Sequence, residues 1–288
     1  MARRVHIIFN PAAGWRRRSR LERVVTRLGE LGAAVTLCET RARGDAEAIA
    51  RGLDETLCDA VVAAGGDGTI NEVMNGLDGS ALPLGIVPLG TANVLAAEIG
   101  LPRDPGAVAD AIAHGRPMPI YCGSVNGRRF AMMVGVGFDA RVVEGLDLAL
   151  KRRVGKAAYV ASAVGALARH AAGGYRVEID GAAHDAAGVV IAKGRYYGGR
   201  FIVAARARLD EPVLQVALFG GAGRGDVLRY ARALASNRIE FLRDVRVLPA
   251  REVRVTGAEG EAVQMDGDLA MSLPLVATVS SRPIALLR

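Results

Sequence analysis

The sequence of 288 residues is poor in aromatic residues and cysteine. Aromatics make up only 5% of it, although 51% of its residues are hydrophobic, so its core must consist of alanine, valine, leucine and isoleucine. Its three cysteines, Cys38, Cys58 and Cys122, form no Cys-x-x-Cys pair. This excludes a disulfide scaffold and a cysteine-based zinc site, and it favours a reducing compartment.

Long hydrophobic runs are also missing. The apolar run before Asn10 (VHIIF) is too short for the core of a signal peptide. The longest weakly polar stretch, at 157–168, falls short of the roughly 18 residues that suggest a membrane span. The sequence therefore predicts a soluble, cytoplasmic protein that is at most peripheral to a membrane.

Lysine is scarce as well, so the net charge of +7 comes almost entirely from arginine. Excess positive charge favours nucleotides, phosphorylated substrates, nucleic acid or an acidic membrane surface as partners. The densest basic clusters lie at 16–20 and 151–156, and each is either a binding surface or a solvated helix face. Because no aromatic stacking platform accompanies them, we do not expect a nucleic-acid partner.

Short apolar runs alternate with helix-period segments in the first third of the chain. We expect strands at 4–9, 33–38, 60–64 and 83–87, and helices at 16–31, 45–57, 70–76 and 92–99. Strands that alternate with helices indicate an α/β domain with a parallel sheet. Ligands of such sheets bind where the strands end, and we expect the loops at 10–14, 65–69 and 88–93 to converge there.

The pattern changes near residue 120, where strand-like pieces begin to dominate. We expect strands at 124–126, 130–136, 175–179, 188–192, 213–219, 251–255 and 262–265, and helices near 153–170 and 225–235. This predicts an α/β nucleotide-binding domain at 1–122 and a mainly β domain at 123–288.

Residues 61–77 read VVAAGGDGTINEVMNGL, in which a buried strand runs into three glycines and a helix. Glycines let the main chain approach a ligand closely, and amides at a helix N-terminus favour phosphate. Asp67 can hold Mg²⁺ through water or hydrogen-bond a sugar or an attacking hydroxyl. Thr69 with Glu72 forms a candidate capping box. The alternative is a tight strand-to-helix turn with no ligand.

Two further loops have the same character. PLGTAN at 88–93 offers Gly90, Thr91 and Asn93 before a helix, and FNPAAG at 9–14 is a third strand-to-loop transition. Three small, polar loops at one sheet edge favour phosphate binding over turns alone.

The motifs N-P-x-x-G, G-G-D-G-T-I-N-E-V and P-L-G-T-A-N, in this order and spacing, resemble the catalytic domain of the diacylglycerol kinase family. This family groups bacterial lipid kinases with sphingosine and ceramide kinases and is distantly similar to NAD kinases and phosphofructokinases. The stretches at 126–143, 151–159, 194–219 and 265–269 extend the resemblance over the whole chain. It implies an α/β domain followed by a β-sandwich-like domain, with the active site in the cleft between them.

The resemblance also implies roles for individual residues. The expected ATP-binding positions are Asn10, Pro11, Gly14, Thr40, Gly65, Gly66, Gly68, Thr69, Asn71, Glu72, Gly90, Thr91 and Asn93. Asp67, Asp266 and Asp268 are the expected catalytic residues, with Asp67 and Asp266 near Mg²⁺. Asp268 stands where the family has a glutamate that acts as general base. Because aspartate is one methylene shorter, either the site is tighter or Asp266 shares the role.

The sequence departs from the family pattern at several acidic positions. Val94 and Tyr121 stand where many relatives carry aspartate, which implies a differently built Mg²⁺ site or a non-catalytic homologue. The segment at 209–212 stands where a structural-metal loop of the Asp-Asp-Gly type can occur. There Pro212 replaces glycine and Gln215 replaces an acid, which counts against this second metal.

One motif points elsewhere. Residues 135–140 match the dinucleotide fingerprint G-x-G-x-x-A, but they open the β domain instead of a βαβ series, which argues against an oxidoreductase.

The sequence is best interpreted as an ATP- and Mg²⁺-dependent lipid kinase that phosphorylates a hydroxyl of a diacylglycerol-like or sphingoid- or ceramide-like lipid. The expected partners are the lipid substrate, a transiently contacted membrane surface and, from the resemblance, a second copy of the chain. The alternatives are a kinase for a soluble hydroxyl substrate such as NAD and a nucleotide-binding pseudokinase with a regulatory role.

Overall fold

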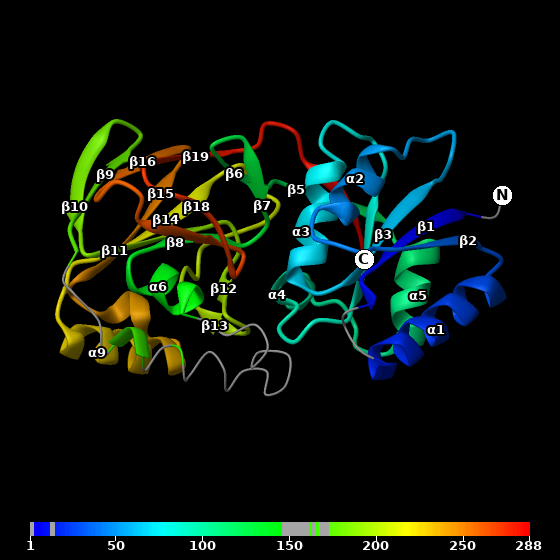
Figure 1. Cartoon of the computed structure of the whole chain (residues 1–288), viewed down its shortest axis with the longest axis horizontal. Helices are drawn as coiled ribbons and strands as arrows, with labels where there is room; N and C mark the ends of the chain where they lie inside the picture. Colours follow the sequence, from blue (N-terminus) through cyan, green and yellow to red (C-terminus); the bar gives the residue numbers. More distant parts are fainter. Residues whose placement is uncertain (1–2, 12–14, 146–161, 163–164, 168–172) are drawn as a thin grey trace. The chain divides into compact units, whose positions relative to one another are not determined.

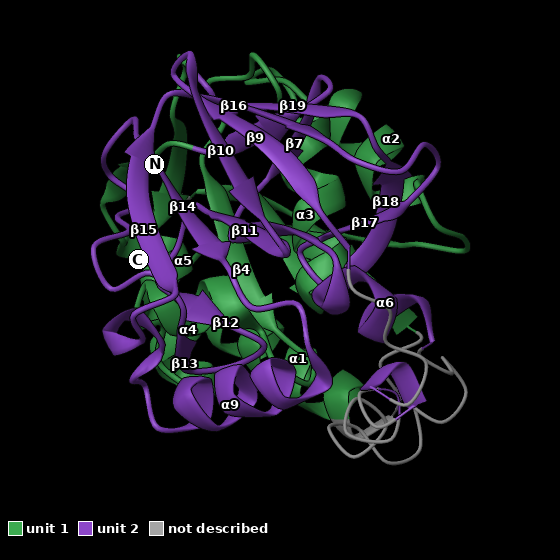
Figure 2. Ribbon diagram, turned by 90° about the vertical axis from the view of Figure 1, so that its left-hand side faces the viewer, with its two compact units in different colours: residues 1–121, 281–288 green, residues 122–280 purple. Residues whose placement is uncertain are grey.

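The computed structural model describes residues 3–11, 15–145, 162, 165–167 and 173–288. The chain forms two compact units (Figures 1 and 2). Unit 1 consists of Met1–Tyr121 together with Ser281–Arg288, and unit 2 consists of Cys122–Ser280. Among the described residues, no helix is both long and apolar enough to cross a membrane.

Unit 1 contains the predicted parallel sheet. Its six strands, in spatial order, are β2 (Ala34–Glu39), β1 (Arg4–Phe9), β3 (Ala60–Gly65), β4 (Leu84–Pro88), β20 (Ile284–Leu287) and β5 (Pro117–Ile120). All neighbouring pairs are parallel except β20 and β5.

Helices cover both faces of this sheet, as Figure 1 shows. Helices α1 (Trp15–Glu30) and α5 (Pro105–His114) pack together on one face, and α2 (Asp45–Arg51) and α3 (Asp67–Gly76) pack together on the other. The short helix α4 (Val94–Glu98) follows β4. Strand β3 is buried at every position, as expected for a central parallel strand with both faces covered.

Helix α2 is shorter than the predicted segment 45–57. It ends at Arg51 because Gly52 caps its C-terminus and Asp54 then organises a turn. The Asp54 carboxylate accepts hydrogen bonds from the N–H groups of Thr56 (2.8 Å) and Leu57 (3.2 Å). Aspartate favours such local bonds over a continued helix.

The last strand belongs to unit 1, whereas the sequence interpretation placed residues 281–288 in the second domain. Strand β20 lies between β4 and β5, and its Leu286 and Leu287 are buried. The chain enters unit 2 at Cys122 and leaves it at Ser280, whose N–H donates to the Cys122 carbonyl (2.8 Å). A four-residue apolar strand suits either unit, so only long-range pairing decides where it lies.

Unit 2 is an antiparallel sandwich of two six-stranded sheets and a small hairpin. The first sheet is β10 (Ala182–Ala186), β9 (Tyr175–Ile179), β16 (Glu252–Thr256), β19 (Leu275–Val279), β6 (Gly123–Val125) and β7 (Arg128–Phe130). The second is β15 (Val245–Ala250), β14 (Leu214–Phe219), β11 (Gly188–Ala192), β8 (Met133–Val136), β17 (Ala262–Met265) and β18 (Asp268–Ser272). The hairpin joins β12 (Tyr196–Tyr197) and β13 (Phe201–Ile202), and the helices described in this unit include α6 (Phe138–Glu144), α9 (Arg224–Ala235) and η2 (Ile239–Phe241).

The core of unit 2 lies between its two sheets. Tyr175, Val177 and Ile179 alternate with exposed residues along β9 and join one buried cluster with Val134 and Val216 of the other sheet. This alternation is typical of a sandwich with one wet and one dry face per sheet. The predicted mainly β architecture is therefore confirmed, while the helix expected near 153–170 lies largely outside the described residues.

Candidate active site

The predicted loops of unit 1 begin side by side at the carboxyl edge of its sheet. The Asn10 N–H donates to the Ala64 carbonyl (3.0 Å), and the Leu89 N–H donates to the Gly65 carbonyl (2.8 Å). Thr40 follows β2 at the same edge. The parallel register therefore brings together four loops that are far apart in the sequence.

Glycines let two of these loops touch. A Cβ placed on Gly90 would lie 2.5 Å from the Gly66 Cα, and one on Gly65 would lie 2.5 Å from the Thr69 Cβ. Both distances are far inside van der Waals contact, so no larger residue fits without main-chain movement. Some of the glycines that predict phosphate binding are therefore also needed for close packing at this sheet edge.

The Asp67 carboxylate joins the same two loops. Its Oδ2 accepts a hydrogen bond from the Asn93 N–H (2.9 Å), and its Oδ1 accepts one from the Val94 N–H (2.6 Å). The Asn93 side chain closes the second loop through two hydrogen bonds with the main chain of Gly90 (both 2.9 Å). Because the Val94 contact uses only the main chain, it does not depend on the side chain at position 94.

The capping box expected from Thr69 and Glu72 is wrong. Helix α3 begins at Asp67, and its N-cap is Gly66, which has an extended backbone and no side-chain cap. The Thr69 hydroxyl instead accepts a hydrogen bond from the Asn10 amide (3.2 Å), and the Glu72 carboxylate accepts one from the Gly44 N–H (3.0 Å). Both residues therefore tie neighbouring loops to α3, and the N-cap residue Gly66 supplies no side-chain cap.

The other expected nucleotide-binding residues differ in exposure. Thr40, Thr69 and Asn71 are buried, and Asn71 accepts hydrogen bonds from the Asn75 amide through its main-chain and side-chain oxygens (2.9 and 3.1 Å). By contrast, Pro11 and Thr91 are exposed, Gly68 lies exposed in the first turn of α3, and Gly14 lies outside the described residues.

In unit 2, the Asp266 carboxylate organises the main chain around it. It accepts hydrogen bonds from the N–H groups of Ala131 (2.8 Å), Met132 (2.9 Å) and Met133 (3.0 Å). These bonds hold a bend at the point where the predicted strand 130–136 breaks into β7 and β8. Asp266 and Gly267 both have positive φ (51° and 88°), which fits a two-residue hairpin turn that presents Asp268 at the start of β18.

A polar network of one buried and two partly buried side chains adjoins this turn. Gln264 donates from Nε2 to the Asp139 carboxylate (2.7 Å) and accepts at Oε1 from the Gly267 N–H (2.9 Å). The Tyr197 hydroxyl donates to the other Asp139 oxygen. Burial raises the pKa of Asp139, and the hydrogen bonds from Tyr197 and Gln264 oppose that shift.

This network explains the apparent dinucleotide fingerprint. A Cβ on Gly135 would lie 1.7 Å from the Asp139 carboxylate, so this glycine makes room for that side chain. Its strand, β8, has antiparallel neighbours on both sides, unlike the first strand of a βαβ unit. Sequence reasoning missed Asp139, Tyr197 and Gln264, although the pairing of Gly135 with an acid four residues later was a usable signal.

Part of the basic cluster at 16–20 is used inside unit 1. The Arg18 guanidinium pairs with Glu39 and lies 5.6 Å from the centre of the Phe9 ring, and Arg20 donates to the Arg103 carbonyl. The cluster at 151–156 lies outside the described residues.

No group of three or more His, Cys, Asp or Glu side chains among the described residues is arranged to hold a metal ion. Mg²⁺ commonly binds through one or two carboxylates plus substrate phosphates and water, and Asp67 fits that mode. Asp266 fits it less well, because three of its roughly four acceptor positions are already used by main-chain N–H groups.

The chain thus combines a parallel α/β unit, whose loops are rich in glycine, with an antiparallel β-sandwich unit. Residues 4–125 match the diacylglycerol kinase catalytic domain, and residues 132–288 match the YegS C-terminal NAD kinase beta sandwich-like domain. The chain belongs to the diacylglycerol kinase catalytic-domain family, a family of lipid kinases.

Named relatives agree with this assignment. A diacylglycerol kinase of Bacillus subtilis (strain 168) is 28% identical over 94% of this chain and 92% of its own length. One from Mycobacterium tuberculosis (strain H37Rv) is 30% identical over 84% of this chain and 78% of its own length. The crystal structure of a diacylglycerol kinase from Bacillus anthracis (strain Sterne) has a TM-score of 0.81 at 22% identity, covers 99% of this chain and 96% of its own, and supports the fold.

The contact between Gly66 and Gly90 can be tested by adding a methyl group. We expect Gly90→Ala to lower the free energy of unfolding by about 1–3 kcal/mol, because the new Cβ overlaps the facing main chain. Gly29→Ala in α1 is the matched control: nothing lies within 4 Å of its Cβ, and it should stabilise by roughly 0.5–1 kcal/mol. Urea unfolding measures both, and equal stability of the two variants would contradict the close approach.

The raised pKa of Asp139 predicts a specific dependence of stability on pH. Because the folded-state pKa of Asp139 is raised, its contribution to stability is complete below the unfolded pKa of about 3.9 and is lost as pH rises through the folded pKa. Asp139→Asn cannot ionise and therefore removes this pH-dependent contribution. As pH rises from acidic to neutral, the free energy of unfolding of wild type should fall relative to that of the variant. Urea unfolding across that range measures the difference. Exposed Asp185→Asn should retain the wild-type slope, and an Asp139→Asn variant with that slope would refute the prediction.

Proposed function

We propose that this protein is an ATP- and Mg²⁺-dependent lipid kinase that transfers the γ-phosphoryl group to a lipid hydroxyl. The observation that carries the proposal is the carboxyl edge of unit 1. There the Asp67 carboxylate holds the loop at 90–93 against the start of α3, whose N-cap residue Gly66 supplies no side-chain cap. Main-chain N–H groups at such a helix end favour phosphate.

In this proposal the nucleotide binds to unit 1. The amides of Gly68 and Thr69 in the first turn of α3 have no acceptor within the helix and bind phosphate oxygens. Asn10 and Thr91 lie at the same edge, where the ribose or phosphates bind. Asp67 contributes to Mg²⁺ binding through water, and when bound, the ion neutralises charge on the phosphates.

The general base is assigned to unit 2. Asp268 takes the proton from the acceptor hydroxyl while the new P–O bond forms and the bond between the β- and γ-phosphates breaks. Asp266 has its carboxylate bound to three main-chain N–H groups. We therefore assign Asp266 to shaping the turn that presents Asp268, in place of the metal-binding role expected from the sequence.

A nucleotide-binding pseudokinase is the second candidate. The family resemblance implies an aspartate at each of the positions that Val94 and Tyr121 occupy here, and two missing carboxylates favour weak or absent catalysis. A pseudokinase would bind nucleotide without transferring phosphate to any acceptor. A kinase for NAD would transfer phosphate to a soluble acceptor, so both candidates differ measurably from a lipid kinase.

The test uses purified protein, labelled ATP and a panel of diacylglycerol, sphingoid base, ceramide and NAD. We expect Mg²⁺-dependent labelling of one lipid class. Asp268→Asn should lower kcat by about 10²–10⁴-fold, because the hydroxyl loses its general base. The unfolding temperature of the variant, measured alongside, separates lost chemistry from lost fold.

Glu259→Gln is the matched control for this variant, since Glu259 is an exposed acid in the loop before β17. It should keep wild-type activity. Full activity of Asp268→Asn would remove that residue from the mechanism while leaving the lipid kinase intact. Nucleotide binding without transfer to any acceptor would favour the pseudokinase.

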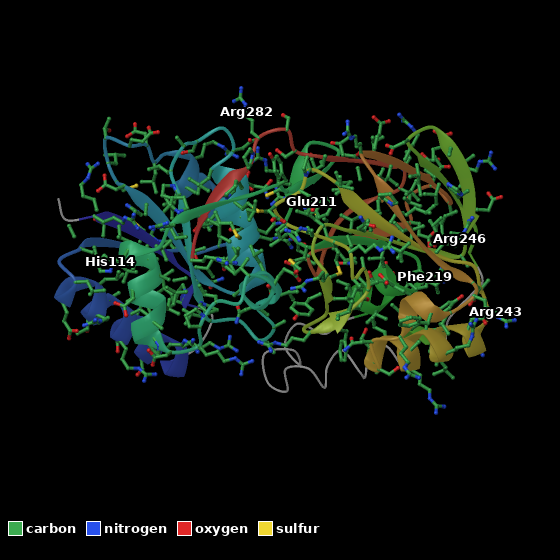
Figure 3. All side chains as sticks on the ribbon, turned by 180° about the vertical axis from the view of Figure 1, so that it is seen from behind. His114, Glu211, Phe219, Arg243, Arg246 and Arg282 are labelled. Carbon is green, nitrogen blue, oxygen red and sulfur yellow. The ribbon has the colours of Figure 1, made fainter. Side chains whose placement is uncertain are left out.

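We further propose that an anionic membrane surface contacts the outer face of α9 and η2. Arg224, Leu228 and Arg232 recur every four residues on an exposed face of α9. Phe241 ends η2, which packs beside α9, and its side chain is 81% exposed. Exposed Arg243 follows it (Figure 3). Arginines around apolar side chains suit an interface between acidic headgroups and acyl chains.

Vesicle sedimentation tests this surface. Wild-type protein should bind phosphatidylglycerol-containing vesicles more tightly than neutral phosphatidylcholine vesicles, and added salt should weaken the binding. A Leu228→Ala/Phe241→Ala double variant should bind at least tenfold more weakly, because burying such side chains contributes about 1.5–3 kcal/mol each. Leu57→Ala, which removes an exposed leucine in unit 1, is the control. Unchanged binding by the double variant would exclude this face.

A further inference from the structure

Lys193 is completely buried in unit 2, with 0% of its surface exposed. It directly follows β11, and it is one of only three lysines in the chain. An ammonium group taken out of water costs several kcal/mol unless it is well paired, so lysine is almost never fully buried without a specific partner. The Lys193 ammonium therefore needs a hydrogen-bonding partner inside unit 2.

That partner is the main chain of a neighbouring loop. The Lys193 ammonium donates a hydrogen bond to the Arg208 carbonyl oxygen. The N–H groups of Lys193 (2.8 Å) and Gly194 (3.2 Å) both donate to the Met132 carbonyl. Met132 in turn donates its own N–H to Asp266. Lys193 thus joins the loop at 208–213 to the bend at 131–133, whose N–H groups bind Asp266 in the turn before Asp268.

The two acidic side chains of this loop, Asp210 and Glu211, are paired with the Arg208 guanidinium. The Arg208 guanidinium donates to both oxygens of Asp210 (3.1 and 2.7 Å) and lies 2.9 Å from Glu211, which is labelled in Figure 3. The Arg208 side chain, with Lys193 adding a weaker effect, lowers the pKa of Asp210. Asp210 and Glu211 are both about half exposed, so they face solvent and Arg208.

A divalent metal does not fit this arrangement. Calcium and magnesium bind carbonyl and carboxylate oxygens, and these are the groups that the loop offers. Here the Arg208 carbonyl is taken by an ammonium and the two carboxylates are taken by a guanidinium. The donor set that would make a structural-metal loop is therefore already neutralised by two cationic side chains.

We propose that the Lys193 ammonium, through its contact with the Arg208 carbonyl, holds the loop at 208–213 in place of a divalent metal, so that unit 2 folds without one. This role goes beyond the proposed kinase function. It is also independent of it, because it concerns the folding of unit 2 and not phosphoryl transfer.

Thermal unfolding of the full-length protein without nucleotide tests the proposal. The unfolding temperature of wild type should be the same in EDTA as in millimolar Mg²⁺ or Ca²⁺. Lys193→Met keeps the aliphatic stem but leaves the Arg208 carbonyl without its donor, and it should lower the unfolding temperature by roughly 3–10 °C. Arg206→Met, which removes an exposed cation from the neighbouring segment, should leave it unchanged.

A second variant distinguishes this loop from other cation sites. If a divalent ion raises the unfolding temperature of wild type and Asp210→Asn abolishes that rise, the loop holds a metal and the proposal is overturned. A rise that persists in Asp210→Asn comes from elsewhere and supports the proposal. A Lys193→Met variant as stable as wild type would overturn it even if no divalent ion had an effect.

Discussion

The candidate site depends on one carboxylate that bridges two loops. Asp67 accepts the N–H groups of Asn93 and Val94, so the loop after β4 is held against the start of the helix after β3. Charge-assisted hydrogen bonds of this kind are stronger than neutral ones, and the carboxylate also lies where the dipoles of two helix N-termini favour it. The close approach of Gly66 and Gly90 completes the junction. Without the carboxylate, the two loops would lose both of these hydrogen bonds.

In unit 2, charged side chains also hold irregular main chain in place. The Asp266 carboxylate accepts hydrogen bonds from three successive N–H groups, and Gln264 connects the turn to Asp139. The Lys193 ammonium, a positive charge, holds a neighbouring loop by donating to the main-chain carbonyl of Arg208. In both units a buried or half-buried charge holds irregular main chain, whose polar groups would otherwise be left without partners. Such charges position residues of the site without needing to touch a substrate.

Much of the architecture could be predicted because it follows from local patterns. Apolar runs alternating with helix-period segments indicate a parallel sheet, and short alternating strands indicate a sandwich. Most predicted elements lie within one or two residues of those observed. The misses have physical causes. Asp54 ends α2 early through local hydrogen bonds, the Asp266 carboxylate breaks one predicted strand into two, and Glu72 binds the Gly44 N–H instead of capping its own helix.

The sequence by itself determined the two-part organisation, the family and the identity of the loops at the sheet edge, because these depend on periodicity and on motif order. Tertiary structure alone decided the partners of the charged groups and the place of the last strand. A half-buried carboxylate or a buried ammonium takes its partner from another segment of the chain: Asp266 from residues 131–133, and Lys193 from Arg208. No local pattern encodes such pairings, since their free energy arises only when folding removes water from both partners.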